Sequence, residues 1–535
     1  MQIFEILLYI SVILMLVAIV CLNLSVFNYW FLILQQNRYL NLKSLKFFYL
    51  ENKLQLKLTI VTLCLFALNV LFVLFLFNYV KLLVLLNLLI IFSVQLYLKH
   101  SFSKIKTKLS LIVTKRVVRL YVTYIILNLL LLLFVLNLLK FSVLYLILFG
   151  LFYAFQGVII VASNIINLPV EFIIKYYYIK KAKQKLKKYP NLQVVAITGS
   201  YGKTSTKNYL YQLLKHKFNV LITPNSFNTP MGITKTILQN LNAGYDIFIV
   251  EMGADHKNDI KKLCNIIKPN ISVITAVGTQ HLKTFKTLKN IIETKYQIVK
   301  YAKQNVVFFT NSFNKVCKNY FDISKCEKYC VGNTTDNDVI LKDFKFENIT
   351  RFTLNINNVD YCFKTRLLGE YNVQNLALCI MIATKLGVSL NVIKSAVKNI
   401  YPVPHRLSLM CLANGAKLID DSFNSNEYGA MQALNVLQSF NKIKVVITCG
   451  MIELGGEQYE KNYNFGKQIA NVADYVCVVN KTNRDAIING LLSQNYNMER
   501  VFEFDDFKSV FDQVLKLANK NCVVLIENDL PDSYK

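Results

Sequence analysis

The stretch VVAITGSYGKTSTKNYL, from Val194 to Leu210, sets the fold of the chain around it. It consists of a short apolar strand, a turn with two glycines that ends in Lys-Thr, and the opening of a helix. Backbone N–H groups at such a helix N-terminus bind phosphate oxygens, and a lysine adds positive charge. The spacing is shorter than the GxxxxGK[ST] pattern, but strand, turn and helix follow in the required order. The stretch predicts a phosphate-binding loop; a glycine turn that only packs is the alternative.

The loop residues share backbone or hydroxyl groups that suit phosphate and its metal. The glycines let the backbone approach phosphate closely, and a threonine hydroxyl is a hard oxygen ligand suited to Mg²⁺. The residues expected to bind the nucleotide here are Gly199, Ser200, Gly202, Lys203, Thr204 and Ser205.

Two polar residues follow the next strands of the chain. Glu251 ends DIFIVE (246–251), and His281 follows ITAVGTQ (274–280). Because ligands bind outside the carboxyl ends of strands in an α/β sheet, both are expected to complete a Mg²⁺ site with Thr204. Taken singly, each is more typical of an ordinary polar loop residue. Lys295, in IIETKYQI, is by itself more typical of a solvated helix lysine.

Apolar runs of strand length recur after residue 190 and alternate with segments of helical period. They are VVAITG (194–199), DIFIVEMG (246–253), ISVITAVG (271–278), VVFFT (306–310), VVITCG (445–450), YVCVV (475–479) and CVVLIEN (522–528). This alternation predicts doubly wound α/β sheets, with an antiparallel insert at 344–368. Pro402 and Pro404 interrupt helix and strand alike. We therefore predict a central P-loop ATPase-like domain at 191–400 and a Rossmann-like C-terminal domain at 401–535.

Residues 1–165 contain apolar runs that are much longer than a β-strand requires. Runs long enough to cross about 30 Å of hydrocarbon predict an α-helical membrane region. Five such runs occur near Ile3–Leu22, Leu58–Asn78, Val80–Leu98, Leu120–Leu139 and Phe141–Ala162. The start MQIFEILLYI has no basic region and further runs follow it, which argues against a signal peptide.

Charge predicts the orientation of these runs. Five basic residues lie between the first and second runs and seven between the third and fourth, whereas the alternate loops hold only Lys81 and Lys140. The positive-inside rule then places everything after the fifth run in the cytoplasm. The lysine-rich segment at 166–190 suits a juxtamembrane helix on anionic lipid headgroups, and a solvated charged helix is the alternative.

The overall basicity does not indicate nucleic-acid binding. The net charge is +29, but residues 1–190 hold 21 Lys and Arg against three Glu, so most of it belongs to membrane topology. No nucleic-acid partner is expected. The 12 cysteines lack the paired CxxC spacing of a zinc site and predict reduced thiols.

Several segments, taken in order over about residues 191–535, resemble the Mur ligase family, the ATP-dependent amide-forming enzymes of peptidoglycan synthesis. TGSYGKTST (198–206) resembles the family's phosphate loop, VEMGA (250–254) its magnesium glutamate and VGTQHLKTF (277–285) its magnesium histidine. IIETKYQI (291–298) resembles the segment whose lysine is carbamoylated in many members. The resemblance implies catalytic roles for Lys203, His281 and Lys295, with Lys295 as an N-carboxylysine that helps to hold a second Mg²⁺.

Four more segments resemble family motifs that contact nucleotide and substrate. They are NSFNTPMGI (225–233), LLGEYNVQN (367–375), PVPHRLSL (402–409) and LIDDSFNSN (418–426). The nucleotide contacts that they imply are Asn372, Asn375, Arg406 and Asp420. The substrate contacts that they imply are Asn225, Asn228, Thr229, Asp421 and Asn424. CGMIELGGE (449–457) resembles a turn typical of the branch that attaches D-alanyl-D-alanine.

Some positions depart from the family pattern. Glu427 stands where proline is usual, Gln297 where glutamate is usual and His405 where glycine is usual. The N-terminus departs most, because family members usually open with a soluble domain for the uridine part of the substrate. Because of these departures, the sequence does not determine the exact substrate.

The resemblance implies an enzyme that uses ATP and Mg²⁺ to join a UDP-MurNAc-peptide to D-Ala-D-Ala through an acyl phosphate. It would act at the inner face of a bacterial cytoplasmic membrane, with membrane lipids and other cell-wall synthesis proteins as partners. One alternative is a related membrane-bound ligase that adds amino acids to a lipid-linked or poly-amino-acid substrate. Another is a membrane scaffold with a degenerate nucleotide site, against which the intact Lys203, Glu251, His281 and Lys295 argue.

Overall fold

The computed structural model describes residues 28–46, 110–137, 156–321, 325–346, 349–423, 425–452 and 454–529. The chain divides into two compact units, Met1–Lys175 with Pro531–Tyr534, and Tyr176–Leu530 with Lys535. Three of the predicted membrane runs, Ile3–Leu22, Leu58–Asn78 and Val80–Leu98, lie outside the described residues, as does the predicted substrate residue Asn424.

In the first unit the described residues form helices. They are a helical segment at 28–36, α2 (Asn41–Lys46), α5 (Lys115–Asn137) and the first part of α7 (Gln156–Lys187). Arg119 on α5 donates two hydrogen bonds, of 2.8 and 2.5 Å, to Glu171 on α7. α5 covers most of the predicted run Leu120–Leu139. Among the described residues, one helical stretch, Gly157–Lys187, is long and apolar enough to cross a membrane.

α7 joins two segments that the sequence pattern separates. The helix runs without interruption from the end of the last predicted membrane run into the lysine-rich segment, with Pro169 inside it. At its C-terminal end Ala182 is fully buried, and Lys185 Nζ donates a 2.9 Å hydrogen bond to the carbonyl of Leu238. This end of the helix is therefore part of the core of the second unit.

The second unit begins with a nine-stranded sheet in the order β2-β3-β1-β4-β5-β6-β7-β8-β9. The strands are β1 (Gln193–Thr198), β2 (Val220–Ile222), β3 (Ile247–Glu251), β4 (Ile271–Ile274), β5 (Val307–Asn311), β6 (Glu327–Gly332), β7 (Val339–Phe346), β8 (Thr350–Ile356) and β9 (Val359–Thr365). Strands β1 to β7 pair in parallel. The predicted antiparallel segment is confirmed, but β7, β8 and β9 extend the main sheet.

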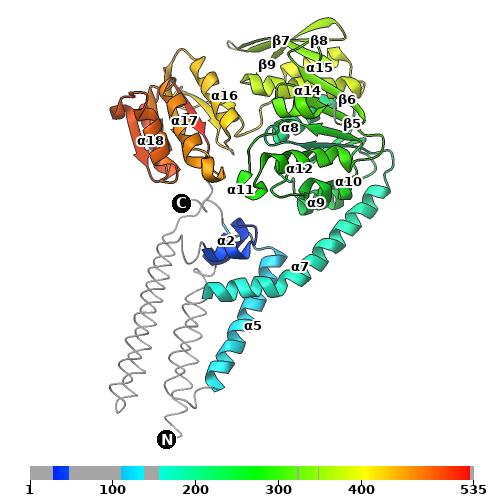
Figure 1. The fold of residues 1–535 in the computed structure, drawn as a ribbon, viewed down its shortest axis with the longest axis vertical. Helices are drawn as coiled ribbons and strands as arrows, with labels where there is room; N and C mark the ends of the chain where they lie inside the picture. The colour runs from blue at the N-terminus through cyan, green and yellow to red at the C-terminus, as the bar shows by residue number, and fades with distance from the viewer. Residues whose placement is uncertain are drawn as a thin grey trace. The chain divides into compact units, whose positions relative to one another are not determined.

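Helices cover both faces of this sheet, as Figure 1 shows. They are α8 (Lys203–Leu214), α9 (Pro230–Asn240), α10 (Asp259–Ile267), α11 (Leu282–Phe285), α12 (Leu288–Lys300), α13 (Lys315–Phe321), α14 (Glu370–Lys385) and α15 (Leu390–Lys398). α8, α14 and α15 bury their apolar sides in one core, through residues such as Leu213, Leu376 and Ile393. α9, α10 and α12 bury theirs in the other, through Ile233, Leu263 and Ile298.

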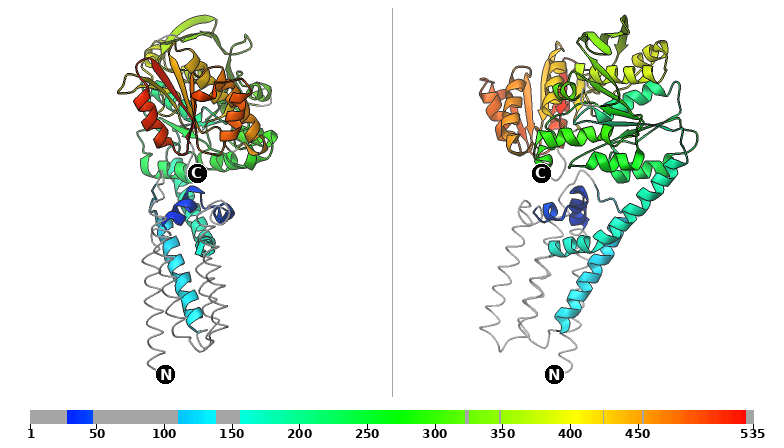
Figure 2. Two further views of the ribbon diagram at one scale, coloured as in Figure 1. Left: turned by 90° about the vertical axis from the view of Figure 1, so that its left-hand side faces the viewer. Right: turned by 45° about the vertical axis from the view of Figure 1, so that its right-hand side comes forward.

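A second sheet of six strands follows, in the order β10-β11-β15-β12-β13-β14. Its strands are β10 (Ser408–Cys411), β11 (Lys417–Asp421), β12 (Ile443–Thr448), β13 (Tyr475–Val479), β14 (Val501–Phe504) and β15 (Cys522–Glu527). Its helices are α16 (Glu427–Gln438), η4 (Gly455–Glu457), α17 (Gln458–Ala470), α18 (Arg484–Leu492), η5 (Met498–Arg500) and α19 (Phe507–Leu517). The left view of Figure 2 faces this sheet, with helices to either side. The prediction of two α/β domains is confirmed.

Candidate active site

The predicted phosphate loop lies at the carboxyl end of β1, in the middle of the first sheet. Gly202 precedes α8 with φ 81°, a left-handed conformation that favours glycine. A Cβ at Gly202 would lie 2.1 Å from the Tyr371 hydroxyl oxygen, and one at Gly199 would lie 2.0 Å from Thr275 Oγ1. Both glycines are therefore required by close approach, because the loop is pressed between β4 and α14.

Lys203 opens α8 and folds back over the loop. Its Nζ donates hydrogen bonds of 2.7 and 3.0 Å to the carbonyls of Gly199 and Ser200. The pKa of Lys203 is lowered to about 8, mainly by burial and also by Arg406, while Glu251 and Asp255 oppose the shift. An anion at this loop would favour the charged ammonium form.

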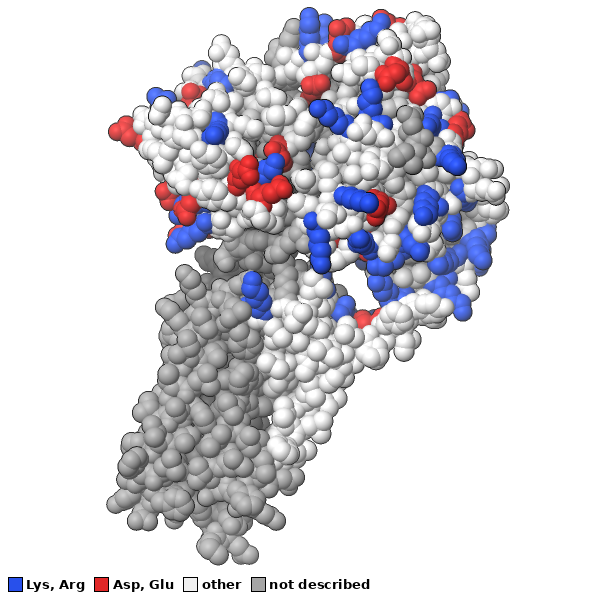
Figure 3. All heavy atoms as spheres, viewed as in Figure 1, with Lys and Arg blue, Asp and Glu red and all other residues white. Residues whose placement is uncertain are grey.

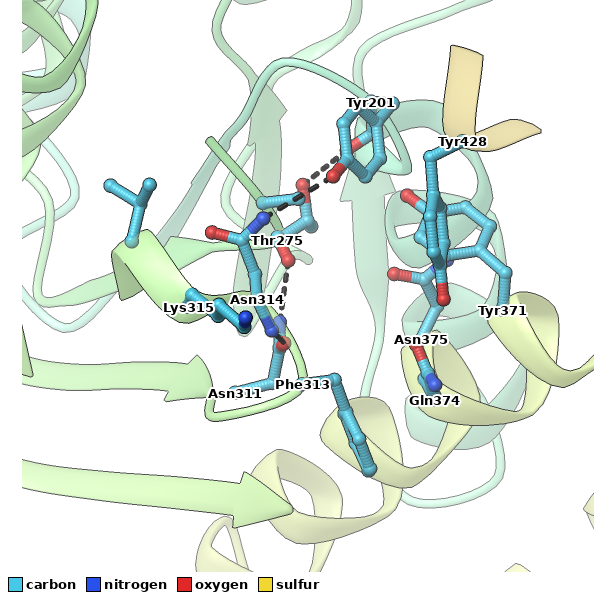
Figure 4. A pocket seen from close by; sticks show the side chains of 12 residues that line it. Tyr201, Thr275, Asn311, Phe313, Asn314, Lys315, Tyr371, Gln374, Asn375 and Tyr428 are labelled. Atoms are coloured by element: carbon cyan, nitrogen blue, oxygen red, sulfur yellow. Dashed lines mark hydrogen bonds between the residues drawn. The ribbon is translucent and has the colours of Figure 1, made fainter. Parts of the chain in front are cut away.

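A cavity of about 230 Å³ opens beside the loop (Figure 4). The rings of Tyr201, Tyr371 and Tyr428 lie together, with the Tyr201 and Tyr428 centroids 5.9 Å apart and the rings nearly parallel. Opposite Tyr371 and Tyr428 lie Asn311 and Asn314, at the carboxyl end of β5. Aromatic faces and amide groups around one cavity suit a flat heteroaromatic ring with its own donors and acceptors.

Two polar atoms at this cavity are buried without a hydrogen-bond partner among the described residues. They are Asn375 Nδ2 and the Tyr371 hydroxyl. A ligand with an acceptor would satisfy them, since buried polar groups are nearly always hydrogen-bonded. Asn375 thus lines the cavity as expected. Asn372 does not line the cavity. Its side-chain amide donates a 2.9 Å hydrogen bond to the Leu368 carbonyl and accepts one of 3.0 Å from the Tyr209 hydroxyl.

Glu251 ends β3 with both carboxylate oxygens engaged. Asn228 Nδ2 donates to Oε1 at 3.1 Å, and Oε2 lies 3.2 Å from Lys207 Nζ. The side chains of Lys207 and Glu251 are each 1% exposed, so this is a fully buried ion pair. Lys207 also donates a short hydrogen bond to the carbonyl of Asn225. One buried ammonium therefore connects the phosphate-loop helix, the metal-ligand candidate and the predicted substrate loop.

His281 lies near the carboxylate of Asp255 and is not part of a complete set of metal ligands in the described part of the chain. Its Nε2 is 3.4 Å from Asp255 Oδ1, and its backbone has φ 59° at the start of α11. Among the described residues, no three His, Cys, Asp or Glu side chains come together as a metal cluster. Mg²⁺ keeps several waters and binds through one or two carboxylates and substrate phosphates, so it does not require such a cluster.

Lys295 is buried on the inner side of α12, with 3% of its surface exposed. Burial lowers its pKa well below the ordinary value, and Lys203 lowers it further, whereas Asp255 and Asp259 oppose the shift. The prediction from the isolated pattern, a solvated helix lysine, is wrong. Lys295 is instead a buried amine whose charge interacts electrostatically with that of the phosphate-loop lysine, Lys203.

Hydrogen bonds hold both ends of the predicted substrate loop. Asn225 takes a left-handed conformation, φ 44°, and its carbonyl accepts the hydrogen bond from Lys207. Thr229 caps α9, with its side chain accepting a 3.3 Å hydrogen bond from the Gly232 N–H. The Thr229 hydroxyl therefore has a structural partner in addition to the predicted substrate role.

In the C-terminal domain, a buried and a half-buried carboxyl group lie at the ends of two adjacent strands. Asp421 on β11 and Glu527 on β15 are direct partners in a parallel register. Burial raises the pKa of Asp421 to about 6, which Arg406 opposes, and burial together with Asp421 raises that of Glu527. The Ser425 hydroxyl donates to Glu527 Oε1 at 2.5 Å. Both shifts favour the protonated forms of these two neighbouring carboxyl groups.

Asp420 points to the opposite face of β11 from Asp421, because side chains alternate along a strand. It accepts a 2.7 Å hydrogen bond from Ser422 and lies 2.7 Å from His405 Nδ1. His405 adopts φ 61°, which explains why glycine suits this position. The predicted nucleotide residue Asp420 and the predicted substrate residue Asp421 thus belong to separate groups.

The sequence matches two family models in this part of the chain. Residues 197–383 match the Mur ligase middle domain, and residues 405–527 match the Mur ligase glutamate ligase domain. The chain carries the middle and C-terminal domains of a Mur ligase.

Curated Mur ligases are similar over these domains. The UDP-N-acetylmuramoyl-tripeptide–D-alanyl-D-alanine ligase of Haemophilus influenzae is 26% identical over 345 residues, 63% of this chain and 73% of the relative. The ligase of the same name from Bacillus subtilis is 26% identical over 340 residues, covering 63% and 72%. That of Escherichia coli is 29% identical over 271 residues, and the match spans only 59% of its length.

Solved Mur ligase structures share the fold. MurF from Thermotoga maritima in complex with ADP superposes with a TM-score of 0.60 at 26% identity, over 66% of this chain and 80% of that one. MurF from Acinetobacter baumannii gives the same TM-score at 22% identity, over 67% and 78%.

Five site residues of this Mur ligase were missed by the motif-based predictions. Lys207 lies four residues after Lys203 and so on the same face of the helix, a spacing that helical periodicity could have revealed. Asn311, Asn314 and Glu527 follow the carboxyl ends of strands, the rule that identified Glu251. The nearness of Asp255 to His281 had no comparable sequence signal.

Proposed function

We propose that this Mur ligase adds D-alanyl-D-alanine to a UDP-MurNAc-tripeptide in peptidoglycan synthesis, with ATP as co-substrate. The observation that carries the proposal is the contact at Gly202 between the phosphate loop and the tyrosine-lined cavity. One nucleotide, with its base among Tyr201, Tyr428 and Asn375, would direct its phosphates toward Lys203. The relatives that carry this ligase name match the same two domains.

The chain contributes positioning and charge to the reaction. ATP supplies the phosphoryl group that activates a carboxylate, and Mg²⁺ neutralises phosphate charge. Lys203 would hold the phosphates, and Thr204, Glu251 and His281 would hold Mg²⁺. Arg406, whose charge interacts with those of Asp421 and Glu251, would contact the same phosphates, as the family motif implies. No covalent protein nucleophile is required.

Lys295 fits the carbamate that the family resemblance implies. Only a neutral amine attacks CO₂, and the lowered pKa of this buried lysine supplies one. The product carries negative charge and two hard oxygens, which suit a second Mg²⁺. Lys203 on one side would favour the negative carbamate over an ammonium, since like charges disfavour one another.

One assay tests the function directly. The full chain in nanodiscs is given UDP-MurNAc-tripeptide, D-Ala-D-Ala, Mg²⁺ and ATP, and phosphate release and product mass are followed. The expected product is the amide-linked pentapeptide, formed only when all components are present. Turnover with a lipid-linked tripeptide but not with the UDP-linked one would favour the alternative acceptor. If neither product forms, the ligase assignment is overturned.

We also propose that the chain is a multi-pass protein of a bacterial cytoplasmic membrane, with its ligase domains in the cytoplasm. The apolar runs before residue 165 and the stretch Gly157–Lys187 support this. A reporter fused after Lys140 should be extracellular, and one fused after Lys106 should be cytoplasmic. The opposite pattern would refute the orientation.

A further inference from the structure

The net charge of the second unit is distributed unevenly along its sequence. Residues 176–321 contain 23 lysines and five carboxylates, a balance of +18. Residues 322–535 contain 23 basic and 24 acidic residues, a balance of −1. A lysine-rich composition throughout the chain would not produce such a difference between two parts of one unit. The excess therefore belongs to one region of the folded unit.

That region is a layer formed by the end of α7 with α9, α10 and α12, and we call its outer side the lysine face. α7 bonds α9 through Lys185, and Lys268, after α10, donates to the carbonyl of Tyr301, after α12, at 3.4 Å. The exposed lysines of this face are Lys180, Lys181, Lys187, Lys188, Lys235, Lys257, Lys262, Lys268, Lys286, Lys289, Lys300 and Lys303. Figure 3 shows basic side chains gathered over these helices.

Little on the lysine face neutralises this charge. Among the described residues of these helices and their loops, Glu293 and Asp246 are the exposed carboxylates; Asp246 accepts a 2.8 Å hydrogen bond from the Asn219 N–H, and Asp259 binds Lys262 at 2.9 Å. Elsewhere in the unit acidic and basic side chains are mixed, as Figure 3 also shows. The helices place their lysines outward because their apolar residues, such as Leu263 and Ile298, fill the core.

Apolar side chains accompany the lysines. Tyr176 and Tyr177 are 62% and 57% exposed at the start of the lysine-rich part of α7, and Met231 and Leu288 are each 38% exposed. Aromatic and apolar groups beside lysines are typical of surfaces that enter the headgroup region of a bilayer. A nucleic-acid surface would use the lysines but has no need of exposed aliphatic groups.

We propose that the lysine face lies against an anionic lipid bilayer and binds its phosphate headgroups. α7 supports this choice of partner, since the same helix is apolar enough to span a membrane before it reaches the lysines. The contact holds α9, α10 and α12 close to the lipid surface. The proposal deepens the membrane attachment proposed above, which requires a bilayer but not an anionic one.

The test compares lysine acetylation of the full chain in two kinds of nanodisc, read by mass spectrometry. One contains phosphatidylcholine alone and the other adds about a third phosphatidylglycerol. Lysines of the face should be acetylated at least threefold more slowly in the anionic nanodisc, and about 0.5 M salt should remove the difference, because salt screens exposed charges. The internal references are exposed lysines elsewhere in the unit: Lys364, Lys394, Lys398, Lys481 and Lys520.

Matched triple variants separate the face from total charge. Lys187→Gln, Lys289→Gln and Lys303→Gln together should reduce the protection of the remaining face lysines. Lys364→Gln, Lys394→Gln and Lys481→Gln remove the same charge elsewhere and should leave it unchanged. All six positions are exposed and lie outside the active site, so both proteins should fold and retain ligase activity.

Equal acetylation in the two nanodiscs would overturn the proposal. So would protection that appears with added RNA in neutral nanodiscs and not with anionic lipid, which would make the face a nucleic-acid surface. Neither outcome depends on ligase turnover, so each is distinguishable from failure of the proposed reaction. Failure of the chain to insert into either nanodisc would refute the membrane attachment and this contact together.

Discussion

The two α/β domains of the ligase differ in the ionisable groups that they bury near their proposed sites. In the middle domain these groups are two amines, Lys207 and Lys295, and one carboxylate, Glu251, which is paired with Lys207, while Lys203 is partly buried. In the C-terminal domain they are carboxyls, the buried Glu527 and the half-buried Asp421. Burial shifts the pKa of the three amines downward and that of the two C-terminal carboxyls upward, in each case toward the neutral form.

This difference matches the two halves of the proposed reaction. Phosphates and an acceptor carboxylate are anions, which buried amines attract strongly in a low dielectric. The incoming amine is a cation in solution, which buried carboxyl groups attract. The same topological rule, ligands at the carboxyl ends of strands, thus produces two sites of opposite electrostatic character.

The largest effect is expected at the phosphate loop. Lys203→Ala should lower kcat by roughly 10²- to 10³-fold, the scale of one lost electrostatic stabiliser at a transition state. Steady-state phosphate release measures it. Lys215→Ala, an exposed lysine just after the same helix, is the control and should keep full activity. A Lys203→Ala enzyme with more than about a tenth of normal activity would remove this cation from the mechanism.

The next effect concerns Lys295, a buried amine proposed to act as an anion. Lys295→Ala should lose on the order of 100-fold in rate, and added acetate or formate should restore part of it by supplying carboxylate oxygens. Lys295→Arg should remain inactive, because a guanidinium keeps its positive charge and forms no carbamate. A nearly normal Arg variant would show that the middle domain uses this residue as a simple cation.

A smaller loss is expected at Lys207, which touches Glu251 and the substrate loop. Lys207→Met should lower activity about 10-fold and reduce the free energy of unfolding by roughly 3 kcal/mol, because Glu251 is left as a buried unpaired charge. Thermal unfolding of Lys207→Met combined with Glu251→Gln measures the coupling. The double variant should be more stable than Lys207→Met alone. If it is less stable, the ion pair does not explain the burial of this lysine.

The smallest effect is on stability, in the C-terminal domain. The folded-state pKa of Asp421, about 6, lies above the value of about 3.9 in an unfolded chain, so the folded state binds the extra proton. The free energy of unfolding should therefore fall as pH rises from about 4 through 6. Glu527→Gln should raise the unfolding midpoint at pH 8 by a few degrees and flatten this dependence.

The matched control for that variant is Glu499→Gln, which changes an exposed glutamate of the same domain. It should leave the pH dependence of the unfolding midpoint unchanged. An identical pH profile for Glu527→Gln and the parent chain would mean that the two carboxyl groups do not affect each other's protonation.

The sequence specified the elements of both domains closely. Each of the seven apolar runs beyond residue 190 overlaps an observed strand, since a buried parallel strand needs a continuous apolar run between turn residues. The need for glycine in the phosphate loop could also be predicted from the sequence. Gly199 and Gly202 follow a strand and precede a helix, and a side chain at either would collide with a neighbour.

Sequence alone therefore determined the strands with continuous apolar runs, the phosphate loop and its lysine, because these depend on local periodicity and backbone conformation. Only the tertiary structure decided that Lys207 pairs with Glu251, that Lys295 is buried, and that Asp421 lies opposite Glu527. Burial and pairing arise where segments distant in sequence meet, and the pKa of an ionisable group follows from its surroundings rather than from its residue type. The pairing of Asp421 with Glu527 joins residues more than a hundred positions apart, so no local pattern carries it.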